Sequence, residues 1–273
     1  MFPTLELFGF PIDMYTVWIV VGIIVCLIFT IFTMKKFGYS ASASDAISII
    51  GVLAIALGFL AGILFQAIYD YIENPSAGFR FDGGMTFLGG LLGGVVVFLG
   101  LYFLYVYVIN PRLKPTNFFK SNMNKGVWYF LRIVPISITI AHGFGRIGCL
   151  FAGCCYGHES HEWYSVYSHN AGHNVIPVQL YEAIFLFVLS GVLILMLYKF
   201  KSKDELAVYL VSYGIWRFVI EFFRDDYRGS FVSNLSPSQF WSILMVIGGI
   251  STFFLYRYFD KKFEDKEKET QVQ

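Results

Sequence analysis

Long apolar runs separated by short polar segments dominate this chain. Three uncharged runs exceed the roughly 18 residues that a helix needs to cross a bilayer. They are Met14–Met34, Ala46–Tyr69 and Gly84–Ile109. A fourth uncharged run, from about Phe240 to Tyr256, reaches spanning length when it is extended back to Ser233. These runs predict transmembrane helices.

Three further runs are long enough to cross a membrane but carry charges. They are about Val127–Phe151, with Arg132 and Arg146; Val175–Tyr198, with Glu182; and Leu206–Phe223, with Arg217 and Glu221. The pattern therefore predicts an all-α polytopic membrane protein with seven transmembrane helices. We expect a single seven-helix membrane domain over residues 1–259, with a small external segment at 152–174, and a charged cytoplasmic tail over 260–273.

Composition supports a lipid environment. Hydrophobic residues make up 56% and charged residues 14%, whereas soluble proteins carry roughly 25% charged residues. A net charge of +1 gives no basic patch for nucleic acid, so no nucleic-acid partner is predicted. Four cysteines are too few for a disulfide scaffold. These values exclude a cytosolic enzyme, a secreted mini-protein and a disordered chain.

Basic residues predict the orientation of the chain. The loops after the first, third and fifth spans, together with the C-terminal tail, hold 14 Lys and Arg. The opposite loops hold 3, namely Arg80, Arg224 and Arg228. Because cytoplasmic loops are enriched in Lys and Arg, the N-terminus is predicted outside and the C-terminus in the cytoplasm. The first span has basic residues only on its C-terminal side, which is the reverse of a signal peptide.

Ionisable residues inside the spans are the first candidates for function, since each costs about 2.5–3.5 kcal/mol at a helix centre. Arg217 and Glu221 are four residues apart and share a helix face. Two interpretations remain open for this pair. It is an internal ion pair that locks two spans together, or Arg217 binds an anion and Glu221 holds it in position.

Arg146 lies in the glycine-rich stretch AHGFGRIGCLFAGCCYG, residues 141–157, at the outer end of the fourth span. The glycines allow the backbone to approach a ligand closely, and the planar guanidinium fork suits phosphate. Two arginines, Arg146 and Arg217, facing one cavity would form a receptor for a lipid phosphate. His142 lies four residues before Arg146 and is either a satisfied polar residue or a base.

Three cysteines follow Arg146 and precede four histidines in the external segment. The spacing of Cys149, Cys154 and Cys155 with His158, His161, His169 and His173 fits no ordinary zinc pattern. No metal ion and no cofactor are therefore predicted. A disulfide, small packing residues and reactive thiols near Arg146 remain open.

Several motifs resemble the prolipoprotein diacylglyceryl transferase family. They are PIDMY at 11–15, GGMTFLGGLLGG at 83–94, GRIG at 145–148, PVQLYEA at 177–183 and RFVIEF at 217–222, in the family's order. The resemblance covers most of the chain, which is similar to a GRIGC…GCCYG branch. It implies seven spans and transfer of a diacylglyceryl group from phosphatidylglycerol to a lipobox cysteine thiol, with release of glycerol phosphate.

The resemblance also implies site residues. Tyr15, Arg146, Arg217 and Glu221 match positions in or near the family's active site, and Gln179, Tyr181 and Glu182 match its QLYE motif. Family members usually have His at Leu88, Asn and Glu at Cys149 and Cys154, His at Ile176 and Arg at Phe59 or Leu60. Since Leu88 cannot accept a proton, His142 becomes the leading candidate for the base, with Cys149 or Cys154 as alternatives.

We therefore expect a membrane transferase with two groups of functional residues. The catalytic candidates are His142, Arg146, Arg217, Glu221 and Tyr15, and the substrate-binding candidates are Arg146, Arg217, Gln179, Tyr181, Glu182, Cys149 and Cys154. The expected partners are phosphatidylglycerol or a similar anionic phospholipid and a prolipoprotein, at the bacterial cytoplasmic membrane. The alternatives are a related lipid-group transferase that uses cysteine chemistry on another acceptor, and a non-catalytic lipid-binding membrane protein.

The orientation can be tested by labelling single introduced cysteines with a membrane-impermeant reagent. We expect labelling from outside within residues 152–174 and protection of the tail after Arg257, because of the distribution of Lys and Arg. A tail labelled from outside intact cells would contradict the predicted orientation.

Overall fold

The computed structural model describes residues 4–7, 10–38, 41–82, 84–109, 123–225 and 235–271. Within this part of the chain, seven helical stretches are long and apolar enough to cross a membrane. They are Met14–Lys36, Ser44–Ile72, Gly89–Ile109, Arg132–Ala152, Val178–Tyr198, Glu205–Phe223 and Pro237–Tyr258. The predicted all-α polytopic membrane fold is confirmed. The start of the seventh predicted span, before residue 235, and the basic loop at 110–122 lie outside the described residues.

Two short antiparallel hairpins accompany the helices, and the apolar pattern did not predict them. Strands β1 (Thr4–Leu7) and β2 (Phe10–Asp13) pair before the first helix. Strands β3 (Val166–Ser168) and β4 (His173–Val175) pair within the predicted external segment. These strands of three or four residues are too short to give a sequence period that can be recognised.

Asp13 caps the first helix, α1 (Met14–Lys36). Its Oδ2 accepts hydrogen bonds from the Thr16 hydroxyl at 2.6 Å and the Thr16 backbone N–H at 3.0 Å. A side-chain acceptor at this position satisfies N–H groups that have no partner within the helix. The hydrogen bond from the Thr16 side chain lowers the pKa of Asp13, because it stabilises the charged carboxylate.

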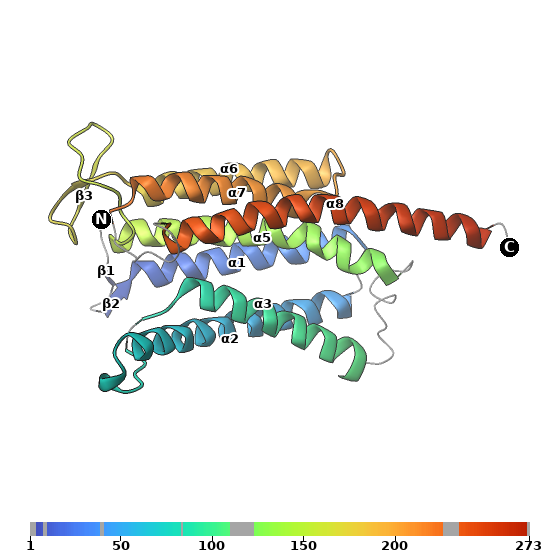
Figure 1. Cartoon of the computed structure of the whole chain (residues 1–273), viewed down its shortest axis with the longest axis horizontal. Coiled ribbons are helices and arrows are strands. Elements are labelled where there is room, and N and C mark those ends of the chain that lie inside the picture. The colour runs from blue at the N-terminus through green and yellow to red at the C-terminus, as the bar shows by residue number, and fades with distance from the viewer. Residues whose placement is uncertain are drawn as a thin grey trace. The chain divides into compact units, whose positions relative to one another are not determined.

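The chain divides into two compact units, residues 31–128 and residues 1–30 with 129–273. In the first, α2 (Ala41–Glu73) packs against α3 (Phe87–Leu104), with a 3-10 turn at Pro75–Ala77 between them and a π-helical turn at Tyr105–Ile109 after them (Figure 1). A Cβ at Gly58 would lie 2.9 Å from the Gly90 carbonyl oxygen and 3.1 Å from the Gly94 Cα. The glycines therefore let the two backbones touch, as is common between membrane helices.

The second unit holds α1 up to Thr30 and four further long helices that run alongside one another (Figure 1). They are α5 (Met123–Ala152), α6 (Val178–Tyr198), α7 (Glu205–Ile220), which continues as a 3-10 turn at Glu221–Phe223, and α8 (Pro237–Gln271). The side chains of Ile136, Leu186 and Leu193 are completely buried between them. Thr30 and Ser137 share a hydrogen bond of 2.7 Å between α1 and α5.

Large apolar side chains cover the outside of the helices. Examples are Ile28, Val188 and Phe254, which are 62–65% exposed. A soluble protein exposes few contiguous apolar patches of this kind. The distribution is that of helices whose outer faces contact lipid.

A buried ion pair joins α5 to α7 near one end of the bundle. The guanidinium of Arg132 donates to the carboxylate of Glu205, with Nε 3.2 Å from Oε2 and Nη2 3.3 Å from Oε1. The Glu205 side chain is completely buried and that of Arg132 nearly so. Each residue neutralises a charge that the apolar surroundings could not solvate.

We expect Glu205→Gln to lower the free energy of unfolding by about 3–5 kcal/mol, because it removes the charge that neutralises Arg132. Thermal unfolding in detergent measures the effect, and the double variant Arg132→Met, Glu205→Met should recover much of the loss. Asp204→Asn is the matched control. It breaks a half-exposed pair with Arg257 that is worth about 1 kcal/mol or less. Equal losses in Glu205→Gln and Asp204→Asn would contradict this account.

Candidate functional site

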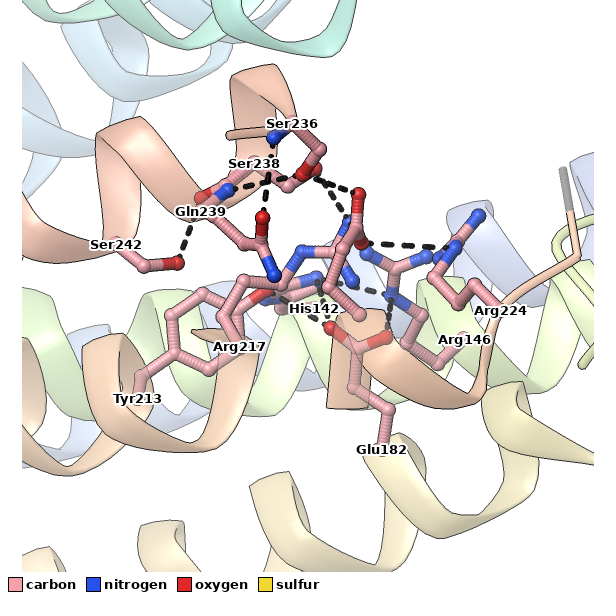
Figure 2. Close-up of polar contacts among 11 residues, drawn as sticks. His142, Arg146, Glu182, Tyr213, Arg217, Arg224, Ser236, Ser238, Gln239 and Ser242 are labelled. Atoms are coloured by element: carbon pink, nitrogen blue, oxygen red, sulfur yellow. Dashed lines mark hydrogen bonds and ion pairs between the residues drawn. The ribbon is translucent and has the colours of Figure 1, made fainter. Parts of the chain in front are cut away.

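The completely buried carboxylate of Glu182 lies at the centre of the candidate site (Figure 2). It projects from the first turns of α6 toward α5 and α7. The Tyr213 hydroxyl of α7 donates to Oε1 at 2.8 Å. The Nε of Arg146, on α5, lies 3.0 Å from Oε2. Glu182 therefore connects three helices.

His142 and Arg146 occupy successive turns of one face of α5. Arg146 Nε donates a hydrogen bond to His142 Nε2 at 3.3 Å, so this N–H points to the imidazole. Glu182 Oε2 therefore attracts the guanidinium through its charge, without a hydrogen bond from Nε. An imidazole nitrogen that accepts a hydrogen bond has no proton, so His142 is neutral with its proton on Nδ1. The imidazole also lies edge-on to the Tyr213 ring, with centroids 5.1 Å apart.

A second ion pair lies beside the first and connects α7 to α8 (Figure 2). Arg217 Nη2 lies 2.8 Å from Glu221 Oε2 and donates to Ser238 Oγ at 2.7 Å. Ser236 Oγ donates to Glu221 Oε1 at 2.9 Å. The pair thus forms within α7 and its 3-10 extension, and Ser238 of α8 and Ser236, the residue before α8, complete it.

Arg224 adds a third guanidinium, with its Nε 3.8 Å from Glu221 Oε2 and a side chain that is 2% exposed. We use the name arginine cluster for His142, Arg146, Glu182, Tyr213, Arg217, Glu221 and Arg224. The cluster has three guanidinium groups against two carboxylates, and its imidazole is neutral. It therefore carries one positive charge in excess, in a place where water is largely excluded, and this arrangement favours binding of an anion.

Arg217 has a donor that points to the same conclusion. Its side chain is 9% exposed, and its Nη1 is buried with no hydrogen-bond partner among the described residues. Leaving a buried charged donor unsatisfied is costly. An anionic oxygen beside Arg217 would satisfy it.

The C-terminal end of α5 brings three thiols together. Gly153, at φ 71°, ends the helix in a Schellman motif, in which its N–H bonds to the Leu150 carbonyl and the Cys154 N–H bonds back to the Cys149 carbonyl. This motif folds Cys154 over Cys149. Cys155 follows with φ 63°, and the three Sγ atoms lie within 4.8 Å of one another. We call these residues the thiol cluster.

Hydrogen bonds from the thiols of Cys149 and Cys154, together with the charges of Arg224 and Arg146, lower the pKa of the Cys155 thiol. Each of these contacts stabilises the thiolate over the neutral thiol. The four cysteines of the chain form no disulfide in the described structure.

Side chains from neighbouring segments hold the backbone of the thiol cluster. The Gln179 amide donates to the Cys154 carbonyl at 2.9 Å. The Asn170 amide donates to the carbonyls of Ala152 and Gly153 at 3.1 and 3.0 Å. Gln179 is three residues before Glu182 on α6, so one helix supports both the thiol cluster and the arginine cluster.

The predicted external segment also pairs with the residues that follow α7. Gly157 forms an antiparallel bridge with Arg224, and the His158 N–H donates to the Phe223 carbonyl at 3.1 Å. The His158 imidazole lies 3.2 Å from the Asp225 carboxylate. These contacts close the end of the bundle next to the arginine cluster.

The structure thus brings together His142, Arg146, Glu182, Arg217 and Glu221 of the predicted site residues. Tyr15 lies beside the same end of α5, because a Cβ at Gly148 would be 3.2 Å from Tyr15 Cδ2. Gln179 contacts the thiol cluster.

Two other residues singled out in the sequence are not part of this group. Tyr181 is adjacent to Glu182 in the chain, so it projects from a different part of the α6 surface, and it is partly exposed. Leu88 is in α3, and its side chain lies outside the described part of the structure.

Several polar residues of the site were not among the predicted site residues. They are Tyr213, Arg224, Ser236, Ser238 and Gln239, which orders the start of α8 by accepting from the Ser236 N–H at 3.0 Å. Tyr213 was recognisable in principle, since it lies four residues before Arg217. Arg224 was counted among the loop cations, but it is buried against Glu221.

Comparison with known proteins gives consistent matches over the chain. Residues 3–255 match the family model described as prolipoprotein diacylglyceryl transferase. A phosphatidylglycerol–prolipoprotein diacylglyceryl transferase of Clostridium tetani is 33% identical over 93% of this chain and 96% of its own length. A second protein of that name, transferase 2 of Clostridium perfringens, is 32% identical over 90% of this chain and 91% of its own length. A Dehalococcoides mccartyi relative with that name is 29% identical over 92% of both chains.

Proposed function

The chain belongs to the prolipoprotein diacylglyceryl transferase family, and on this premise we propose that it moves a diacylglyceryl group from phosphatidylglycerol to the cysteine thiol of a prolipoprotein. It is a multi-pass membrane protein, and we place its reaction at the outer face of the bacterial cytoplasmic membrane. The observation that carries this proposal is the excess positive charge of the buried arginine cluster.

The lipid phosphate is the anion that this cluster would bind. Arg146 and Arg217 lie on α5 and α7, and each is neutralised by a carboxylate on one side only. A phosphodiester between them would neutralise the excess positive charge and accept a hydrogen bond from Arg217 Nη1. Arginine forks match two phosphate oxygens at once.

In the reaction, the acceptor sulfur forms a bond to the glycerol carbon that bears the phosphate ester. The carbon–oxygen bond breaks, its electron pair leaves with glycerol phosphate, and the thiol proton goes to a base. The leaving group gains negative charge as the bond breaks. Fixed guanidinium groups in a site with little water stabilise that charge in the transition state.

We assign the base to His142. Its Nε2 lone pair is occupied by the Arg146 N–H at 3.3 Å. When Arg146 turns toward the phosphate, this lone pair becomes available to the acceptor thiol. Binding of the lipid and readiness of the base are coupled in this way, because both depend on the same guanidinium.

The activity can be tested in a bacterial strain that lacks its own transferase. Expression of this chain should restore the diacylglyceryl modification of the N-terminal cysteine of lipoproteins, measured by mass spectrometry. A chain that binds phosphatidylglycerol but restores no modification would be a non-catalytic lipid-binding protein. A different lipid group on the acceptor would indicate a related transferase.

Arg146→Ala and Arg217→Ala should each lower turnover by at least about 100-fold, as expected when a donor to a developing negative charge is removed. Arg146→Lys and Arg217→Lys should also impair turnover, because lysine lacks the planar fork. Arg80→Ala is the control, since Arg80 is exposed and pairs with Asp82. Protein abundance and thermal unfolding establish that the variants fold. Unchanged turnover in Arg217→Lys would favour a purely structural ion pair.

His142→Gln should lose most activity, while Cys149→Ser and Cys154→Ser should keep part of it. Glutamine can make similar polar contacts, but its side-chain amide cannot accept the thiol proton. The rate of diacylglyceryl transfer to a lipobox peptide, measured for each variant, distinguishes a histidine base from a thiol base. Normal turnover in His142→Gln together with an inactive Cys154→Ser would assign the proton transfer to a thiol instead.

A further inference from the structure

The proposed transferase reaction leaves the thiol cluster without a defined role. Cys149, Cys154 and Cys155 place three Sγ atoms within 4.8 Å of one another. Cys149 is buried and the other two are partly buried. Three such side chains converging on one point match a metal centre more closely than a packing arrangement, because each sulfur can donate to a common ion.

The distances are compatible with a tetrahedral ion. Zinc binds thiolate sulfur at about 2.3 Å, which corresponds to sulfurs about 3.8 Å apart. The sulfurs of the thiol cluster therefore need to approach one another by at most about 1 Å. A disulfide would use two of the three sulfurs at about 2.05 Å and leave the third unexplained.

The backbone around the thiol cluster is fixed without any ion. The Schellman motif at Gly153 sets Cys154 against Cys149, and Gln179 and Asn170 hold the carbonyls of this turn. A binding site built in advance avoids much of the entropy cost of ordering its ligands. The sequence spacing did not reveal the site, because the helix end reverses the chain between the first and second cysteine.

The chemistry of the three sulfur ligands determines which cation the site would take. Thiolate ligands bind zinc and similar soft cations in preference to magnesium and calcium. The site is therefore expected to bind a cation of the zinc type.

We propose that Cys149, Cys154 and Cys155 bind one Zn²⁺ ion through three thiolates, with the fourth coordination position open to water or another ligand. This site revises the expectation from spacing that the chain binds no metal. Among the described residues, no histidine lies within ligand distance of the thiol cluster, and His158 and His161 face Asp225 and Glu159 instead. The inference is independent of the transferase activity, because it concerns binding to the folded chain.

Metal binding can be measured on the full chain, purified in detergent with its cysteines reduced and its metals removed. After addition of Zn²⁺ and removal of the excess, elemental analysis should find one zinc per chain. Mg²⁺ added in the same way should not be retained. Co²⁺ in place of Zn²⁺ should give the intense absorption of sulfur-to-cobalt charge transfer, which reports thiolate ligands directly. Less than half a zinc per chain would overturn the proposal.

Serine variants identify the ligands. Cys149→Ser, Cys154→Ser and Cys155→Ser should each weaken Zn²⁺ binding at least about tenfold. Cys26→Ser, which changes a cysteine in the middle of α1, is the matched control and should bind like the unchanged chain. Zn²⁺ should raise the Tm of the unchanged chain and of Cys26→Ser, since a ligand of the native state stabilises it. A similar rise in Cys154→Ser would overturn the proposal.

A redox experiment separates the metal site from a disulfide. Protein purified without reductant is analysed by intact mass and by peptide mapping under non-reducing conditions. The proposal requires three thiols that bind zinc. A disulfide between two of these cysteines, seen as a loss of two hydrogens in most molecules, would overturn it. The outcome does not bear on lipoprotein modification, so failure here is distinguishable from failure of the proposed function.

Discussion

A charge inside an apolar helix bundle must be neutralised within the protein, and this constraint organises the unit that contains the site. Helix α5 carries two arginines, and each meets a carboxylate of another helix: Arg132 meets Glu205, and Arg146 meets Glu182. The arginines are about 21 Å apart along α5 at 1.5 Å per residue. Two ion pairs at separate points along α5 restrict both its rotation about its axis and its position along that axis relative to α6 and α7. Because an unpaired charge in this environment is costly, few other arrangements of these helices are acceptable.

The two ends of this arrangement differ in their charge balance. At the Arg132 end, one arginine meets one glutamate, and the pair is complete. In the arginine cluster, Arg146, Arg217 and Arg224 share two carboxylates, and a buried nitrogen of Arg217 has no hydrogen-bond partner among the described residues. The first arrangement is balanced in charge. The second keeps one positive charge in excess, and this difference is the basis for our proposal that the arginine cluster binds an anion.

The arginine cluster and the thiol cluster share their supports. Cys149 follows Arg146 by three residues on α5, and Gln179 precedes Glu182 by three residues on α6. Gly157 and His158 pair with Arg224 and Phe223, which follow α7, at the same end of the bundle. A change in the backbone at Gly153 therefore reaches both clusters, since the hydrogen bonds of Gln179 and Asn170 connect that turn to α6 and to the β3–β4 hairpin.

From the sequence alone, the membrane class, the seven spans and charged residues within them such as Arg146, Glu182, Arg217 and Glu221 could be predicted, because length, apolarity and a charge inside a span are local properties. The sequence also identified His142 with Arg146 and Arg217 with Glu221, since four-residue spacing places both members on one helix face. It could not assign Glu182 to Arg146, or Ser238 to Arg217, because these partners come from different helices and meet only when the helices pack. Nor could it bring Cys149 to Cys154, since a Schellman turn depends on hydrogen bonds at the helix end. Tertiary structure decided the charge balance of the site, because that balance is a sum over residues that lie far apart in the chain.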